Sequence, residues 1–437
     1  MSKIRVFLVF ISGFIIIQGL HIQAQESKAR SEMLDLIRRE KMDIILPQAM
    51  RENNIDMWII VQKFGHIDPL SYDLGGGSPS DKWSEGEFLG YLVFTDRGDD
   101  RIERAALGAR GDSNIYDIFG KTEDLREFME ERDPKVIAVN MSKRVGVADG
   151  LSYTCYLSLV KALGEKYTER LVSSEKLVCD FRSRRVASEI ALFQEVSELT
   201  AHLMERALSN EVIKPGVTTL GDVGWWIADQ LKALGHKPKP GFPYVIYPKR
   251  ASSKDYIIQR GNLLSMDEGL PIMNFCCCIK RIAYVLREGE TDLPTTIKDT
   301  FQHGLKVREI IRKNVKPGRS GIDTLEILYR KLEDAGYQRQ EVEDQVSDSP
   351  NIEVNIGWHS VGHQSHGAGP AIWTEKPLRR EMILMPTHFM AFEFFIYMPM
   401  PEASGKKLRL GLEDDIIITE NGVEWLYPPI DRIQLIR

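Results

Sequence analysis

The stretch Trp358-His359-Ser360-Val361-Gly362-His363-Gln364-Ser365-His366-Gly367 places three of the chain's nine histidines within eight residues. Imidazole is both an acid–base group and a common metal ligand. Glycine lets backbone and ligand approach closely. The cluster therefore indicates a metal or catalytic site. Histidines carried by a glycine-rich surface turn are the alternative that this stretch alone leaves open.

Acidic residues lie on either side of the histidine cluster in the sequence. Glu393 interrupts the aromatic run Phe392-Glu393-Phe394-Phe395, where a charge is costly unless it is paired or metal-bound. Glu413 alternates with leucines and so lies on the polar face of a predicted strand, where simple solvation is the alternative. Asp267 ends an apolar run before a turn, and its alternative interpretation is an ordinary turn-initiating aspartate.

The order of these residues resembles that of the pita-bread metallopeptidases, the family of creatinase, methionine aminopeptidase and Xaa-Pro aminopeptidase. The elements that carry the resemblance are the segment 261–269 with Asp267, the histidine stretch, Glu393, and Glu413-Asp414 followed by Thr419. It covers residues from about 180 to 437. The preceding region is similar to the N-terminal domain of the creatinase and Xaa-Pro aminopeptidase branch. The resemblance implies an α+β protein, with a C-terminal pita-bread fold preceded by a smaller α/β domain.

The resemblance also implies roles for individual residues. In that family two aspartates, one histidine and two glutamates bind a pair of divalent metals. Asp267, His359, Glu393 and Glu413 match four of these ligands, and Gly362 matches a glycine of the motif. Glu393 matches the glutamate proposed to act as base, and His366 matches the histidine that contacts the substrate. His366 and Glu393 are therefore the implied catalytic residues.

Two departures from the family pattern concern the metal site. The family's second aspartate comes eleven residues after the first and precedes an x-Thr-Arg-like pair, whereas this chain has Cys278 followed by Ile279-Lys280-Arg281. A second active-site histidine of the family should fall within residues 244–258, and none is there. Paired metals about 3.5–4 Å apart need bridging carboxylates, and a thiolate favours zinc over manganese or magnesium. One bound metal, a zinc-shifted site and loss of catalysis all remain open.

The first residues have the pattern of an export signal. Lys3 and Arg5 precede a mostly apolar run from Val6 to Leu20, and Ile22-Gln23-Ala24 fits a cleavage site. A membrane anchor is the alternative, but the run is shorter than the roughly 20 residues of a spanning helix. We predict a signal peptide at residues 1–24 and a protein exported to the periplasm or secreted.

Hydrophobic periodicity and the resemblance together divide the remaining chain into an α/β domain at residues 25–178 and a domain at 179–437, for which the resemblance implies the pita-bread fold. In the first domain we predict a helix over 31–54, strands over 55–61, 91–95 and 136–139, and a loop over 75–85. In the second we predict helices over 187–209, 219–235, 294–315 and 322–336. Residues 262–286 are predicted to form two strands joined by a turn at Gly269–Pro271, and the chain beyond Asn351 is predicted to be rich in strands.

Composition excludes several classes of protein. The chain has 437 residues, with 57 Lys and Arg against 63 Asp and Glu, so it offers no electrostatic footprint for nucleic acid. Five cysteines are too few for a disulfide scaffold, and the run Cys276-Cys277-Cys278 is not a CxxC motif. We interpret the run as small buried residues of a strand, with Cys278 also a candidate metal ligand.

Three functions are compatible with these observations. The first is an exported metallo-aminopeptidase that removes the N-terminal residue from peptides with proline second, using one or two divalent ions (Mn, Zn or Co). The second is a catalytically impaired pita-bread homologue that binds a peptide or small amine without turnover. A metal-free creatinase-type hydrolase is third, and the absent upstream histidine disfavours it. The expected partner is a peptide substrate, with no nucleic acid and no membrane after signal cleavage, and a homodimer stays open.

Overall fold

We describe the protein from a computed structural model that covers residues 27–79, 89–238, 245–247, 253–341, 349–373, 377–400 and 407–437. The predicted signal peptide lies outside these ranges. Within them, none of the helices combines the length and apolar character that a membrane crossing requires. The chain divides into two compact units, the first ending at Leu177 and the second extending from Val178 to Arg437.

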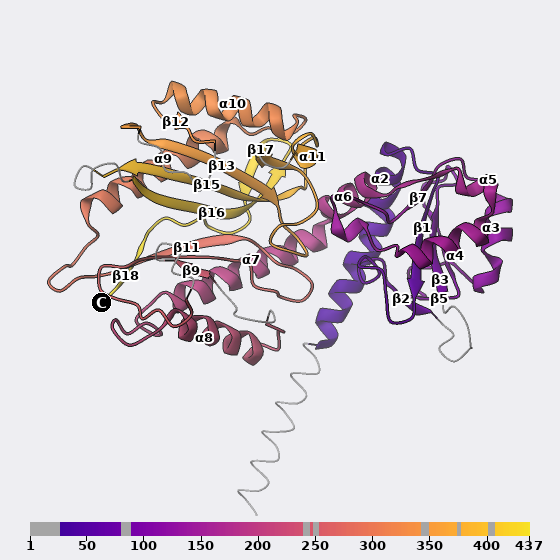
Figure 1. Cartoon of the computed structure of the whole chain (residues 1–437), viewed down its shortest axis with the longest axis horizontal. Helices are drawn as coiled ribbons and strands as arrows, with labels where there is room; N and C mark the ends of the chain where they lie inside the picture. The colour runs from indigo at the N-terminus through magenta and orange to yellow at the C-terminus, as the bar shows by residue number, and fades with distance from the viewer. Residues whose placement is uncertain are drawn as a thin grey trace, which may run out of the picture. The chain divides into compact units, whose positions relative to one another are not determined.

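The first unit is built on a mixed six-stranded sheet in the order β6-β4-β3-β1-β7-β8 (Figure 1). The central strand β1 pairs antiparallel with β3 and parallel with β7. Its strands are β1 (Met57–Lys63), β3 (Leu89–Thr95), β4 (Glu103–Leu107), β6 (Ile118–Gly120), β7 (Ile137–Val139) and β8 (Leu171–Ser173). A separate pair joins β2 (Gly76–Pro79) to β5 (Ala109–Gly111).

Helices accompany this sheet, as the α/β pattern predicts. Residues 27–52 are helical, with a π-helical turn at Lys41–Ile45 before α2 (Leu46–Glu52). The others are α3 (Leu125–Arg132), α4 (Tyr153–Leu163), α5 (Glu165–Thr168) and α6 (Glu175–Ser183). Side chains of α3 and α4, among them Leu125 and Leu159, join the alternate residues Met57, Ile59 and Val61 of β1 in one buried cluster. This cluster is the core of the first unit.

The second unit contains two sheets. The first has four strands in the order β18-β11-β10-β9, with β10 antiparallel to β11. The second has the order β12-β13-β15-β16-β17, with β14 also paired to β13. The strands are β9 (Val245–Tyr247), β10 (Leu263–Glu268), β11 (Ile279–Val285), β12 (Gln338–Arg339), β13 (Glu353–Ser360), β14 (Ala371–Trp373), β15 (Phe389–Pro399), β16 (Lys407–Thr419), β17 (Gly422–Trp425) and β18 (Gln434–Ile436).

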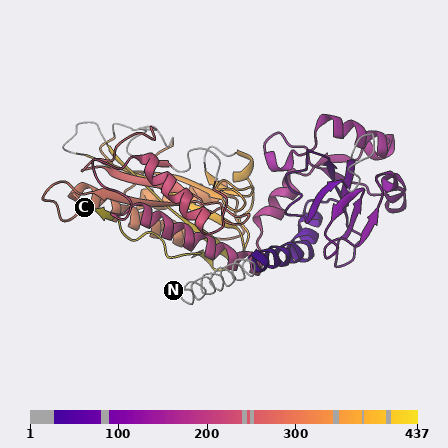
Figure 2. The ribbon, with the colours of Figure 1, turned by 90° about the horizontal axis from the view of Figure 1, so that it is seen from below.

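Two pairs of helices cover the two sheets from opposite sides (Figure 1). Helix α9 (Thr295–Asn314) lies beside β15 and β16, and α10 (Gly321–Asp334) packs on α9 and lies beside β12 and β14. Helix α7 (Ala187–Ala207) lies beside β11, and α8 (Leu220–Ala233) packs on α7. Figure 2 shows α7 and α8 in front of the strands when the molecule is seen from below. A short helix, α11 (Pro377–Arg380), precedes β15. This arrangement of helices and mainly antiparallel strands confirms the predicted α+β class.

Local signals in the sequence explain where these helices begin. Thr219 accepts a hydrogen bond from the Asp222 amide, and Asp222 accepts one from the Thr219 amide, so a capping box starts α8. Ser320 accepts from the Asp323 amide at the start of α10. The apolar faces of α9 and α10 pack with β13, β15 and β16 around Trp358 and Phe392 in a single cluster. That cluster fixes the face of the sheet on which α9 and α10 lie.

Three local predictions need correction. Part of the segment expected to be a loop at 75–85 forms β2, because Gly76 and Pro79 pair with β5; residues 80–85 lie outside the described ranges. The strands β10 and β11 are joined by residues 269–278 rather than by a tight turn at 269–271. Cys276, Cys277 and Cys278 are buried, as expected, but precede β11 instead of lying in a strand.

Candidate functional site

Strand register brings four of the charged residues into two facing pairs. Asp267 on β10 is the direct cross-strand partner of Lys280 on β11. Glu393 on β15 is the direct partner of Glu413 on β16. Like charges directly opposite each other destabilise a sheet, so the glutamate pair requires a cation close by.

Lys280 supplies that cation. Its Nζ lies 2.5 Å from Glu393 Oε1, 2.5 Å from Glu413 Oε2 and 2.9 Å from Asp267 Oδ2. The side chains of Lys280, Glu393 and Glu413 are buried, whereas that of Asp267 is 38% exposed. One ammonium group therefore binds three carboxylates from three different strands, with Asp267 on the side open to solvent.

His359, on β13, lies against the two glutamates. Its Nε2 is 3.4 Å from Glu413 Oε1 and 3.8 Å from Glu393 Oε2. Its Nδ1 is 3.3 Å from the carbonyl oxygen of Ser360. The Ser360 carbonyl and the Glu413 carboxylate both accept hydrogen bonds, so each ring nitrogen of His359 faces an acceptor. Within the described part of the chain, neither His359 Nε2 nor Glu413 Oε1 has a hydrogen-bond partner, although both atoms are buried.

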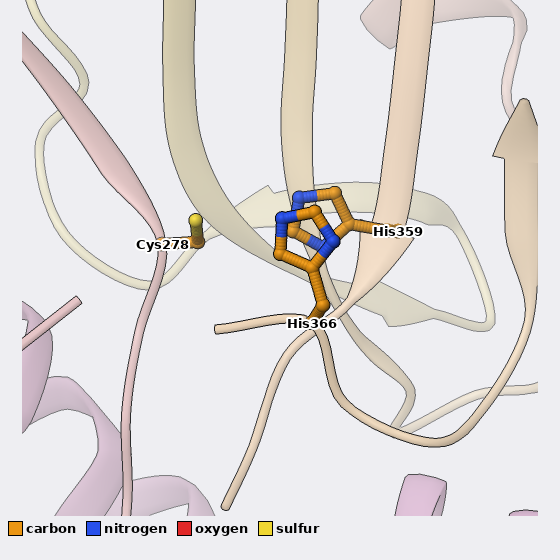
Figure 3. A group of neighbouring side chains, drawn as sticks. All are labelled: Cys278, His359 and His366. Carbon is orange, nitrogen blue, oxygen red and sulfur yellow. The ribbon is translucent and has the colours of Figure 1, made fainter. Parts of the chain in front are cut away.

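Cys278 and His366 complete this group of side chains. The His359 and His366 rings stack with centroids 4.1 Å apart. One ligand atom from each of Cys278, His359 and His366 lies within 4.8 Å of the other two. Figure 3 shows the two rings one in front of the other, each with a nitrogen on the edge nearer to Cys278. Cys278 and His359 are buried, whereas His366 is exposed, so the group reaches solvent through His366.

A close backbone contact positions the histidine stretch. The Cys276 amide donates to the Gly362 carbonyl at 2.6 Å, and Arg185 Nη2 donates to the Val361 carbonyl at 2.7 Å. A Cβ at Gly362 would lie 2.2 Å from that same Arg185 nitrogen. Arg185 is held in turn by a buried ion pair with Glu189. Glycine at 362 therefore allows Arg185, just before α7, and the cysteine segment both to bind the histidine stretch.

The pKa values in this buried group follow from the short distances between its charged side chains. Burial by itself lowers the pKa of Lys280, but Asp267, Glu393 and Glu413 outweigh it and raise that pKa well above its usual value. Burial raises the pKa of Glu393 to about 7 even though Lys280 opposes the shift. Burial would raise the pKa of Glu413 too, but Lys280 and His359 hold it below its usual value. Lys280 is thus charged, with Glu413 as its firmest anionic partner.

Neighbouring residues on β16 have partners of their own. Arg281 Nη1 donates to Asp414 Oδ1 at 2.8 Å. The backbone amide of Cys278 donates to both carboxylate oxygens of Asp415, at 3.3 and 3.2 Å. Three consecutive acids of β16 thus face the segment that contains Cys278, Lys280 and Arg281. Glu413 is buried, which excludes simple solvation as the explanation for its position on the strand.

A pair of hard divalent ions does not fit these residues. A two-metal centre relies on carboxylates that bridge the ions. Here Asp267, Glu393 and Glu413 already bind an ammonium group, and Cys278 stands where the resemblance places a further carboxylate. A second cation beside Nζ would add repulsion without adding a ligand. Lys280 Nζ contacts one oxygen of each carboxylate. The donors outside these contacts are Cys278, His359, His366 and the second carboxylate oxygens of Asp267, Glu393 and Glu413.

The structure brings together all the site residues that the sequence indicates, namely Asp267, Cys278, His359, His366, Glu393 and Glu413. It leaves out His363, whose ring instead contacts Phe275 at 5.1 Å between centroids. The segment expected to hold an upstream histidine, 244–258, lies partly outside the described residues. Sequence reasoning missed the role of Lys280. The available signal was a lysine at the position where the family pattern has threonine.

Comparison with known proteins agrees with this fold. Residues 191–420 match the sequence profile of metallopeptidase family M24. The match spans more than half of the chain, and the chain belongs to this family. No protein of curated function matches it in sequence.

Solved structures of similar fold include enzymes that act at proline. An X-Pro aminopeptidase from Thermotoga maritima MSB8 has a TM-score of 0.60 and 16% identity over 89% of this chain and 99% of the other. A prolidase from Pyrococcus horikoshii OT3 has a TM-score of 0.58 and 20% identity over 90% and 99%. The dipeptidase PepE from Mycobacterium ulcerans has a TM-score of 0.60 and 16% identity over 92% and 98%. At these identities the likeness establishes the fold alone.

Proposed function

We propose that this protein binds a peptide or small amine at the carboxylate group around Lys280, without hydrolysis by a two-metal centre. The observation that carries the proposal is the position of Lys280 Nζ, within 2.9 Å of Asp267, Glu393 and Glu413. An ammonium in that position occupies the oxygens that a metal pair would need.

The remaining charge favours a cationic ligand. Three carboxylates face one ammonium, and burial raises the pKa of two of them, Asp267 and Glu393, the latter to about 7. A further cation beside these carboxylates would favour their charged forms and would be attracted by them. Asp267 is the partly exposed carboxylate of the three. A peptide's terminal ammonium can reach Asp267 from solvent, while the exposed His366 can donate a hydrogen bond to the peptide carbonyl.

Binding assays with matched peptides test this proposal. The mature chain should bind an Xaa-Pro dipeptide in a calorimetric titration, and the same dipeptide acetylated at its N-terminus should bind at least about tenfold more weakly, because the charge-assisted contact to Asp267 is lost. No hydrolysis should follow when Mn²⁺, Co²⁺ or Zn²⁺ is added. Equal affinity for the free and acetylated dipeptides would refute the proposed recognition of the amine.

An Xaa-Pro aminopeptidase is the second candidate. One ligand atom from each of His359, Glu393 and Glu413 lies within 4.8 Å of the others, and His366 stacks beside them, which is the constellation that the family resemblance implies for catalysis. Turnover would require Lys280 to leave the carboxylates. Metal-dependent release of the N-terminal residue from an Xaa-Pro peptide by the parent protein would establish this candidate in place of the first.

Export completes the proposal. The basic residues, apolar run and small-residue site within residues 1–24 support cleavage of a signal peptide. Mass spectrometry of the N-terminus after expression in the native host tests it.

A further inference from the structure

We propose that the first unit carries a docking site for an extended peptide with an acidic end, which adds to the free edge of β8 beside an open, mainly apolar cleft. All residues that line the cleft belong to the first unit. The proposal is therefore independent of ligand binding in the second unit.

The first support is the position of β8 in its sheet. It is the last strand of the sheet order and, within the described chain, it pairs with β7 alone. The Ser174 amide donates to the Val139 carbonyl of β7. Because residues of a parallel strand bond to their neighbour alternately, the N–H and C=O groups of Leu171 and Ser173 point away from β7. That edge can accept one further strand, the mode by which many domains bind extended peptides.

The second support is the cleft that borders this edge. It has a volume of about 1030 Å³, and Val172 and Ser173 of β8 line it together with Met141, Tyr153 and Tyr156. Tyr153 is 74% exposed and Val172 is 39% exposed, although both lie in the cleft. Apolar side chains gathered in a cleft yet open to water favour an occupant that buries them. Since β8 has only three residues, such contacts must supplement the main-chain hydrogen bonds.

The charge at the rim of the cleft selects the occupant. Three basic residues line the cleft after the C-terminal ends of β7 and β8, namely Lys143, Arg144 and Lys176. All three are exposed, and none forms an ion pair with a described residue. The acidic lining residues Asp149 and Glu175 are engaged differently, because both accept hydrogen bonds from Ser142. The bound strand is therefore expected to carry carboxylates where it passes this end of β8.

Fluorescence anisotropy with the full mature chain and a labelled peptide tests the proposal. The peptide is Glu-Glu-Val-Thr-Val-Tyr-Val-Glu-Glu, with the label on its N-terminus and an amide at its C-terminus. Its acidic ends suit either strand direction, and its blocked N-terminus cannot supply the amine that we propose to bind at Asp267. The peptide should bind with a stoichiometry of one per chain. Exchange of its four glutamates for lysines, or of its central valine for proline, which lacks the N–H donor, should weaken binding at least about fivefold.

The chain offers matched variants at the edge and at the rim. Ser173→Pro removes an N–H that points away from β7 and should lower the affinity more than about fivefold, the effect of one lost backbone hydrogen bond. Ser173→Ala loses the same hydroxyl but keeps the N–H, and it should bind as the parent does. Arg144→Glu should weaken binding roughly three- to fivefold, the upper range for an exposed ion pair. Lys161→Glu, on α4 and outside the cleft, should have no effect. Circular dichroism confirms that each variant folds.

Three results would each overturn the proposal: no binding of the acidic peptide by the parent, equal affinity for the acidic and basic peptides, or equal affinity of Ser173→Pro and Ser173→Ala. Sedimentation of the parent and of Ser173→Pro supplies a fourth. A concentration-dependent dimer that Ser173→Pro abolishes would assign the β8 edge to a second copy of the chain in place of an acidic peptide.

Discussion

Lys280 is the cross-strand partner of Asp267, and its ammonium nitrogen lies 2.9 Å from Asp267 Oδ2 while also binding Glu393 and Glu413 at 2.5 Å. Because of this contact, the metal-binding motif that the chain shares with its family does not form a simple two-metal centre. The same strands and the same acids remain, but an internal cation satisfies them. The consequences can be measured in stability, metal binding and ligand affinity.

Removing the charge of Lys280 should destabilise the second unit. Lys280→Met keeps much of the side-chain volume but leaves three carboxylates without their cation, and breaking a buried ion pair typically costs about 3–5 kcal/mol. The Tm of Lys280→Met should therefore be clearly lower than that of the parent. Mn²⁺ or Zn²⁺ should then raise the Tm of Lys280→Met more than that of the parent, because the carboxylates are available again. Lys298→Met, which removes an exposed ion pair with Asp292, is the control and should leave the Tm nearly unchanged, because solvent screens such a pair. Equal effects of the two substitutions would show that Lys280 does not hold the carboxylates together.

Restoring a two-metal centre should require two substitutions. Cys278→Asp alone adds a carboxylate but leaves Lys280 among the acids, so we expect at most one ion per chain. Adding Lys280→Thr vacates the position of Nζ, and the double variant should bind two ions when metal content is measured after dialysis. Two ions bound by the single Cys278→Asp variant would mean that the lysine is no barrier.

His366 should contribute to ligand affinity rather than to the stability of the fold, because its side chain is exposed at the edge of the group. Under the peptide-binding proposal, His366→Ala should weaken binding of an Xaa-Pro dipeptide roughly five- to tenfold, as expected for a net loss of about 1 kcal/mol from one hydrogen bond. The Tm should change little. His363→Ala is the matched control and should leave affinity intact; a loss of affinity in that variant alone would reassign the contact.

Gly362 should tolerate no side chain. In Gly362→Ala the new methyl group would lie 2.2 Å from Arg185 Nη2, so the guanidinium or the histidine stretch must move. Overpacking of this kind costs about 1–3 kcal/mol. Chemical denaturation of the purified protein measures that cost. Gly146→Ala is the control, since a Cβ there would contact nothing within 4 Å, and it should change the free energy of unfolding by less than about 0.5 kcal/mol. A Gly362→Ala variant as stable as the control would show that Arg185 yields freely.

Much of this protein follows from the sequence alone. Helical periodicity predicted both ends of α7, α8, α9 and α10 to within two residues, because each helix has an apolar face and clear start or stop residues. The order and spacing of Asp267, His359, Glu393 and Glu413 indicated the family, since a charged residue inside an aromatic strand such as β15 has few structural explanations.

The state of the site was decided only by the tertiary structure. Sequence spacing identified Cys278 as the altered ligand position, but it could not show where the side chain of Lys280, two residues later, would end. That position depends on the register of β10 with β11 and on the contact of β11 with β16, which are pairings between residues far apart in the chain. A long flexible side chain reaches whichever carboxylates the packing of the two sheets brings within range. The sequence thus determined which donors are present, and the packing determined that an ammonium group lies among them.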